Sequence, residues 1–260
     1  MNDWDDLQHR IVTCTRCPRL REHCTRVAAE KRASFRDQEY WGRPLANLGG
    51  PAARLLVVGL APAAHGGNRT GRMFTGDRSA DFLFRAMYDA GFASQAESVH
   101  KDDGLRLIDA AVTAVAHCAP PANKPAPDEL ANCSGFLEET VDLMPDVRVV
   151  LALGRIAFDA CLRLYAGRGW LPAGARKPAF AHGAVYRFDA APHLAASFHP
   201  SQQNTFTGRL TPPMLRAVFE DCRRLIDARS PEAARDRPGR ARQRRVAGSS
   251  PVRHHGTASP

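Results

Sequence analysis

Apolar and polar segments alternate along the chain in a way that predicts strands followed by helices. Short apolar runs predict strands at 55–58, 107–116, 147–153, 185–188 and 194–198. Apolar residues at helical spacing predict helices at 79–90, 127–144, 155–165 and 212–228. Ser79 is the expected N-cap of the first of these helices, and Gly91 its stop. This order favours an α/β fold, a three-layer sandwich with helices on both faces of a central, mainly parallel sheet.

The composition limits the kinds of binding partner and the cellular location to be expected. The chain has 260 residues, a formal net charge of +9 and a pI of about 9.6, which favours a polyanionic partner. We see no apolar run long enough to span a membrane. The polar, acidic start at 1–10 does not fit a signal peptide, so we expect a cytoplasmic protein.

The charge is unevenly distributed along the chain. Residues 1–228 have the composition of one folded domain, whereas 229–260 are rich in Arg, Pro, Ser and Gly and are expected to be disordered. Four arginines form a basic cluster in this tail: Arg240, Arg242, Arg244 and Arg245. The tail is either a solvated extension or a non-specific phosphate-binding segment.

A glycine-rich turn at 59–77 follows the first predicted strand and is the most informative stretch. Glycines let backbone approach a ligand, and the helix expected after the turn offers free N–H groups to an anion. Arg69, Arg72 and Arg78 add positive charge around one carboxylate, Asp77. The turn lacks the Lys-Ser or Lys-Thr of a nucleotide-hydrolase phosphate loop and the glycine spacing of a dinucleotide fingerprint.

Three polar residues come just after three different predicted strands. They are Asp77, Asn123 and His199. Because ligands of open α/β sheets bind where the carboxyl ends of strands meet, we expect these side chains to line one crevice.

The seven cysteines indicate thiols or a metal site rather than a disulfide framework. No strand precedes the Cys14-x-x-Cys17 pair, which disfavours a thioredoxin-like redox motif and favours half of a metal or cluster site. Cys118 and Cys133, beside predicted element ends, are the best candidates for the other half. Spacing does not distinguish zinc from [4Fe–4S]. Cys24 is interpreted as a free thiol, and Cys161 and Cys222 as core residues.

Three motifs resemble those of the uracil-DNA glycosylase superfamily, in particular its family 5, the type B enzymes. The first is Gly59-Leu-Ala-Pro-Ala-Ala-His-Gly66 with Asn68-Arg-Thr-Gly-Arg72 and Phe74-Thr-Gly-Asp77; the second is His199-Pro-Ser201; the third is Cys118-Ala-Pro-Pro-Ala-Asn-Lys-Pro125. Trp41-Gly-Arg-Pro44 is also similar, with Trp41 either an anchor for DNA or a lid over the core. The resemblance covers about residues 14–226.

The resemblance implies a fold, a cofactor and an activity. It implies a uracil-DNA glycosylase-like sandwich and a [4Fe–4S] cluster on Cys14, Cys17, Cys118 and Cys133, expected to be structural. It also implies a monomeric base excision repair enzyme that acts on single- and double-stranded DNA near the nucleoid. Such an enzyme flips the damaged nucleotide out of the helix and hydrolyses its N-glycosidic bond.

The resemblance also suggests roles for single residues. Phe74 is either a stacking platform for the flipped base or a core residue. Asn123 offers both a donor and an acceptor to a base edge. His199 is expected to stabilise the departing base by donating a hydrogen bond, with a purely structural role as the alternative. Gly59, Ala61, Ala63, His65, Arg72 and Ser201 complete the expected substrate-binding set, Ser201 through a phosphate.

The first motif departs from better-known branches of the superfamily, which carry a polar or acidic residue where this chain has Leu60 and Ala61. We therefore hypothesise that Asp77 orients water or stabilises the sugar cation. The small side chains should admit larger bases, and the resemblance implies that these are uracil and also hypoxanthine and ethenocytosine. Lys124 offers a Schiff-base route to strand cleavage, but the resemblance implies a monofunctional enzyme.

Two other classes of protein remain as alternatives. One is a non-catalytic nucleic-acid-binding module with a structural metal cluster. The other is a zinc-bearing hydrolase that acts on nucleotides.

Overall fold

Four buried strands form the centre of the fold. The computed structural model describes residues 2–171, 174 and 176–228. The strands are β1 (Leu48–Gly49), β2 (Leu55–Gly59), β3 (Ala110–Ala114), β4 (Val149–Leu153), β5 (Val185–Tyr186) and β6 (His193–Ser197). β2, β3 and β4 are buried at every position, as expected for strands covered on both faces.

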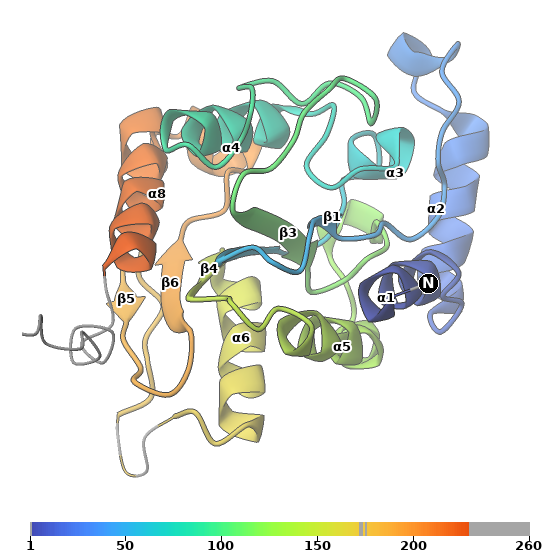
Figure 1. Cartoon of the computed structure of the whole chain (residues 1–260). Coiled ribbons are helices and arrows are strands. Elements are labelled where there is room, and N and C mark those ends of the chain that lie inside the picture. The colour runs from blue at the N-terminus through green and yellow to red at the C-terminus, as the bar shows by residue number, and fades with distance from the viewer. Residues whose placement is uncertain (1, 172–173, 175, 229–260) are drawn as a thin grey trace, which may run out of the picture. The chain divides into compact units, whose positions relative to one another are not determined.

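Helices cover both faces of this sheet (Figure 1). The helices are α1 (Asp3–Val12), α2 (Pro18–Glu30), α3 (Gly67–Thr70), α4 (Arg78–Asp89), α5 (Pro127–Asp142), α6 (Arg155–Gly167), α7 (Gln202–Phe206) and α8 (Pro212–Asp227). Two 3-10 turns are η1 (Ala33–Phe35) and η2 (Pro121–Asn123). The predicted α/β sandwich is confirmed.

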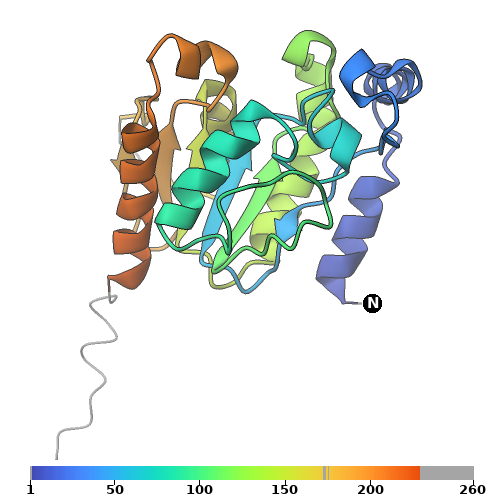
Figure 2. The ribbon, with the colours of Figure 1, turned by 90° about the horizontal axis from the view of Figure 1, so that it is seen from above.

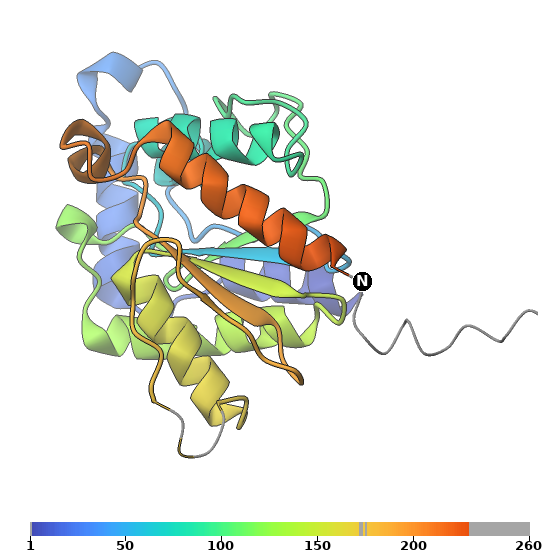
Figure 3. The same ribbon diagram turned by 90° about the vertical axis from the view of Figure 1, so that its left-hand side faces the viewer.

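The strand order is β1-β3-β2-β4-β6-β5. The four central strands run parallel, with Val57 opposite Val112 on one side and opposite Leu151 on the other. The two edge strands, β1 and β5, are antiparallel to their neighbours. The sheet is therefore mainly parallel, as predicted. Figure 3 shows it between α8 and α6.

Alternating residues of β2 supply the two cores. Leu55 and Val57 pack with α4 and α8, whereas Leu56 and Val58 pack with α5 and α6. A change of strand register by one residue would exchange these faces, so the pattern specifies the register.

The strand predicted at 107–116 is shorter than expected, since β3 covers only Ala110–Ala114. Asp109 has a φ of 55°, which ends regular extended backbone before β3 begins at Ala110. Its carboxylate accepts hydrogen bonds from Arg54 and Arg223, which compensate for this conformation. Leu107 pairs only with Ala93, in an isolated bridge.

Two N-terminal helices, which the pattern above did not include, pack beside the domain. Asn2 caps α1, whose Trp4, Leu7 and Ile11 are buried. Pro18 begins α2, where a proline costs no helical hydrogen bond. The loop between these helices carries Cys14 and Cys17.

Residues Met1–Ala228 group as one unit by their contacts, and the basic tail expected to be disordered, 229–260, lies outside the described residues. Within the described ranges, none of the helices has the length and apolarity needed to cross a bilayer.

Candidate active site

Connections at the carboxyl edge of the sheet carry the polar residues predicted above. Asp77 ends the long connection after β2, Asn123 lies in η2 after β3, and His199 follows β6 by two residues. Figure 2 shows the connections after β3 and β6 at the same edge of the sheet. The fold therefore places the three residues after three parallel strands, as expected.

Phe74 and His199 lie side by side over the end of β2. Their ring centroids are 5.9 Å apart, and the ring planes are 31° from parallel. The Phe74 ring also covers Gly59, where a Cβ would lie 2.8 Å from two ring carbons. Phe74 has a φ of 47°, a costly conformation for an aromatic residue that the surrounding loop must hold. Only a glycine at position 59 leaves room for this ring.

His199 presents an uncharged imidazole at this edge of the sheet. Among the described residues, none forms a hydrogen bond with its ring nitrogens, whereas its backbone oxygen accepts a 2.8 Å bond from Asn204. Burial lowers the pKa of His199 from 6.5 to about 4, so the ring is neutral at pH 7. Gly154 packs closely against His199, because a Cβ there would lie 3.2 Å from the His199 Cβ.

Asp77, and not Ser79 as predicted, is the N-cap of α4. Its Oδ1 accepts a 3.0 Å hydrogen bond from the Ala80 N–H. Burial raises the pKa of Asp77 above 3.8, and hydrogen bonds from the N–H groups of Ala80 and Ser79 only partly offset this effect. The other oxygen, Oδ2, faces Gly66, where a Cβ would lie 1.9 Å away. A half-buried carboxylate with a raised pKa is suited to orient or activate water.

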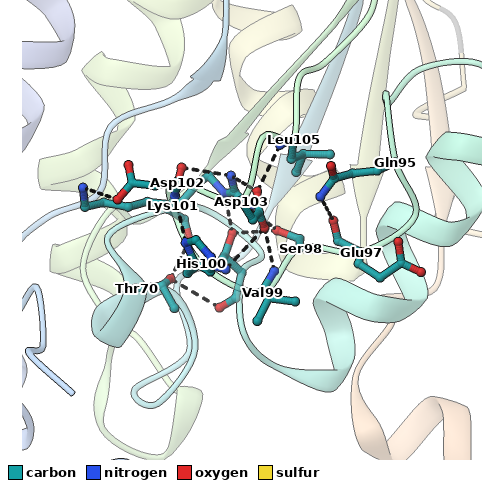
Figure 4. Close-up of polar contacts among 12 residues, drawn as sticks. Thr70, Gln95, Glu97, Ser98, Val99, His100, Lys101, Asp102, Asp103 and Leu105 are labelled. Atoms are coloured by element: carbon teal, nitrogen blue, oxygen red, sulfur yellow. Dashed lines mark hydrogen bonds and ion pairs between the residues drawn. The ribbon is translucent and has the colours of Figure 1, made fainter. Parts of the chain in front are cut away.

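The Arg72 guanidinium is engaged within the protein. Its five N–H donors are satisfied by Thr75, Ser98, Asp103 and the Lys101 carbonyl. The ion pair with Asp103, at 2.6 Å, leaves both side chains only 8% exposed. Asp103 also accepts hydrogen bonds from the N–H groups of Val99 and Leu105 (Figure 4). Arg72 therefore holds the 98–105 loop against the first motif.

Arg69 and Trp41 also support the first motif from within. Arg69 is 7% exposed, donates to the carbonyls of His65 and Gly76, and lies 4.0 Å from the Phe35 ring centroid. Trp41 packs on Gly71, where a Cβ would lie 3.2 Å from the indole. Trp41 is therefore a partly buried side chain packed against the core. Of the three motif arginines, only Arg78 remains exposed.

The other predicted site residues lie around these groups, with no described contact that joins them to Asp77 or His199. His65 is half-buried and hydrogen-bonds the Tyr40 hydroxyl at 3.1 Å. Ala61 and Ala63 are half-buried beside it in the chain, and Asn123 is exposed with a φ of 57°. Ser201 is the N-cap of α7 and accepts from the Asn204 N–H.

All four predicted ligand cysteines line one small cavity. Cys14, Cys17, Cys118 and Cys133 reach it from the α1–α2 loop, the connection after β3, and α5. Burial raises the pKa of Cys133 to about 11, and a hydrogen bond with Cys24 together with burial raises that of Cys118 further. Within the described ranges, no group of three or more His, Cys, Asp and Glu is arranged to hold a metal ion.

The remaining cysteines lie where the pattern put them. Cys24 is a buried free thiol whose sulfur contacts the Ala119 carbonyl at 3.5 Å. Cys161 and Cys222 are buried in the two cores on either side of the sheet.

Sequence reasoning did not single out three features of this edge. Gly66 and Gly154 each leave space for one functional side chain, a requirement visible only once the chain is folded. Phe206, in α7, is a 66% exposed aromatic whose ring lies 5.0 Å from the guanidinium of Arg78. Its local signal was weak, because α7 has only five residues.

The fold agrees with comparison to known proteins. The chain belongs to the uracil DNA glycosylase superfamily, whose model matches residues 46–223.

Three relatives illustrate the similarity. A protein named "Type-5 uracil-DNA glycosylase" from Mycobacterium tuberculosis is 48% identical over 221 residues, 85% of this chain and 81% of the relative. A protein of the same name from Thermus thermophilus is 48% identical over 217 residues, 83% of this chain and 94% of the relative. A third, from Pyrobaculum aerophilum, is 44% identical over 216 residues, 83% of this chain and 90% of the relative.

Proposed function

We propose that this protein is a monofunctional DNA glycosylase of base excision repair that removes uracil and also hypoxanthine and ethenocytosine. Membership of the superfamily and the names of its relatives support the action on uracil in DNA. The observation that carries the proposal is the half-buried Asp77 carboxylate at the same sheet edge as the Phe74 ring and the His199 imidazole, whose nitrogens have no hydrogen-bond partner among the described residues.

Each of these groups has one task in the reaction. Phe74 stacks on the extruded base, and the neutral His199 donates a hydrogen bond to the base as negative charge grows on it. Asp77 orients water at C1′ or stabilises the sugar cation. The N-glycosidic bond breaks with its electrons leaving on the base; water adds to C1′ and releases a proton. Asn123 pairs with the base edge, and Ser201 contacts a phosphate.

The range of bases that the enzyme accepts follows from the small residues of the first motif. Ala61 and Ala63 have small side chains, which leave more room for the base than larger residues would. Leu60 carries no charge to repel a substituted base. The product is an abasic site in an intact strand. Lys124 is exposed at η2 and takes no covalent part, so borohydride should trap no protein–DNA adduct.

A [4Fe–4S] cluster is proposed on Cys14, Cys17, Cys118 and Cys133. Four thiols around one cavity match the donor set that such a cluster requires. The cluster would join the α1–α2 loop to the connection after β3, near the crevice, and serve structure rather than redox chemistry. Equal amounts of iron and acid-labile sulfide, absent from Cys118→Ala, would support it; zinc without iron would refute it.

The protein is further proposed to act as a monomer in the cytoplasm, near the nucleoid, on single- and double-stranded DNA. The net charge of +9 supports a polyanionic partner.

Base release from duplexes tests the proposal. Each duplex carries one uracil, hypoxanthine or ethenocytosine, and alkali reveals abasic sites. We expect strand breaks only after alkali. Tight DNA binding without release of any base would instead indicate a non-catalytic nucleic-acid-binding module.

A further inference from the structure

A cavity whose lining includes neither Asp77, Phe74 nor His199 lies between α6 and β5. Its volume is about 970 Å³, within the range of ligand-binding sites. It is lined by α6 from Arg155 to Ala166, a length of about 16 Å at the usual helical rise. Lys177 and neighbouring residues of the connection after α6 close its other side. The cavity thus begins near the carboxyl edge of the sheet and continues away from it.

The floor of this groove is apolar. Leu162 is 3% exposed, and Leu171, Val185, Tyr186 and Phe188 are half-buried. β5 is the last strand of the sheet, so its outer edge has no further strand among the described residues. A half-exposed apolar floor beside an edge strand is suited to an extended chain with apolar side chains.

The rim is strongly basic. Arg163, Arg176, Lys177 and Arg187 are exposed, and none of them forms an ion pair within the described ranges. The carboxylate of Asp159 also lines the groove, but it is paired with Arg155 at 2.9 Å. Four uncompensated cations therefore surround an apolar floor.

The combination favours one kind of occupant. The tail at 229–260 carries the same sign of charge as the rim and is disfavoured by repulsion. Duplex DNA would satisfy the rim, but its phosphates present little to an apolar floor. A peptide with acidic residues next to a large apolar side chain satisfies both surfaces.

We propose that the groove between α6 and β5 is a docking site for an acidic peptide segment of a partner protein, anchored by an aromatic or aliphatic side chain. The apolar anchor lies on Leu162 and Phe188, and the acidic residues face Arg163 and Arg187. This site is separate from the glycosylase reaction, so occupancy leaves base release from short duplexes unchanged.

The test uses the full chain and the fluorescent peptide Asp-Asp-Glu-Asp-Leu-Phe, with binding followed by anisotropy. Arg163→Glu/Arg187→Glu should weaken binding roughly tenfold or more through like-charge repulsion. Arg85→Glu/Arg106→Glu, an equal change of charge at exposed positions outside the groove, should leave binding within about twofold. Circular dichroism confirms that both variants are folded.

Three outcomes would overturn the proposal. The first is no binding by the wild-type chain. The second is equal binding of a peptide in which Leu-Phe is replaced by Ser-Ser, which would reduce the interaction to charge alone. The third is a loss of affinity for undamaged duplex in Arg163→Glu/Arg187→Glu as large as the loss for the peptide, which would make the groove a DNA contact.

Discussion

Gly66 and Asp77 are in contact across the first motif, and the contact leaves no room for a side chain at position 66. A Cβ there would lie 1.9 Å from the Asp77 Oδ2 and 2.8 Å from its Cγ. The glycine therefore determines where the carboxylate lies.

Gly66→Ala should displace the Asp77 carboxylate and slow base release. A misplacement of about 1 Å in a reacting group costs roughly 10²-fold in rate. Single-turnover base release measures this loss, and DNA binding should change little. Gly135→Ala is the matched control, since nothing lies within 4 Å of a Cβ at that helical position. Full activity in Gly66→Ala would show that Gly66 does not position the Asp77 carboxylate for the reaction.

Phe74→Ala should weaken base capture, because it removes the ring beside His199. Stacking of one base on an aromatic side chain is worth about 1–3 kcal/mol. We expect a corresponding loss in kcat/KM for uracil-containing duplex, measured by steady-state base release. Phe74→Tyr keeps the ring and should retain most activity. Equal activity in the two variants would mean that Phe74 is a core residue and not a platform for the base.

Titration of His199 should not change the rate of base release between about pH 6 and pH 8. His199, with a pKa of about 4, is already neutral throughout this range. The pKa of Asp77 is raised, so its carboxylate takes up a proton at a higher pH than an ordinary aspartate, and activity should fall on the acid side. A pH series of single-turnover rates tests this. A tenfold loss per pH unit as pH rises above neutrality would instead require a charged imidazole.

Asp103→Ala should destabilise the fold by about 3–5 kcal/mol, because it leaves the buried Arg72 guanidinium without its counter-charge. Denaturant unfolding measures this change. Arg85→Ala, which breaks an exposed 3.4 Å pair with Glu97, should cost about 0–1 kcal/mol. If the two variants unfolded alike, the 98–105 loop would not depend on the Arg72–Asp103 pair.

Elements with strong local signals were predicted correctly. β2 and β4 are continuous apolar runs, and Pro127 and Gly154 mark the starts of α5 and α6. The N-cap was misplaced because Asp77 and Ser79 are both good caps and only packing distinguishes them. α1 was missed although Asn2 and the spacing of its apolar residues could have indicated it.

The sequence could predict only those site residues that follow a strand. His199 and Asp77 follow strands, so their common edge could be inferred from topology. The role of Arg72 could not, because its partner Asp103 is 31 positions away and nothing local links them. The contact of Gly66 with Asp77 likewise exists only in the folded loop.

Asp77→Asn tests the central claim most directly, since asparagine also caps helices well and should preserve α4 while it removes the charge. The measurement is single-turnover release of uracil from duplex by the wild-type chain and by Asp77→Asn, with DNA affinity measured alongside. The account predicts release by the wild type, with strand breaks only after alkali, and a loss of roughly 10²-fold or more in the variant at unchanged affinity. Equal release by both proteins would contradict the role given to Asp77.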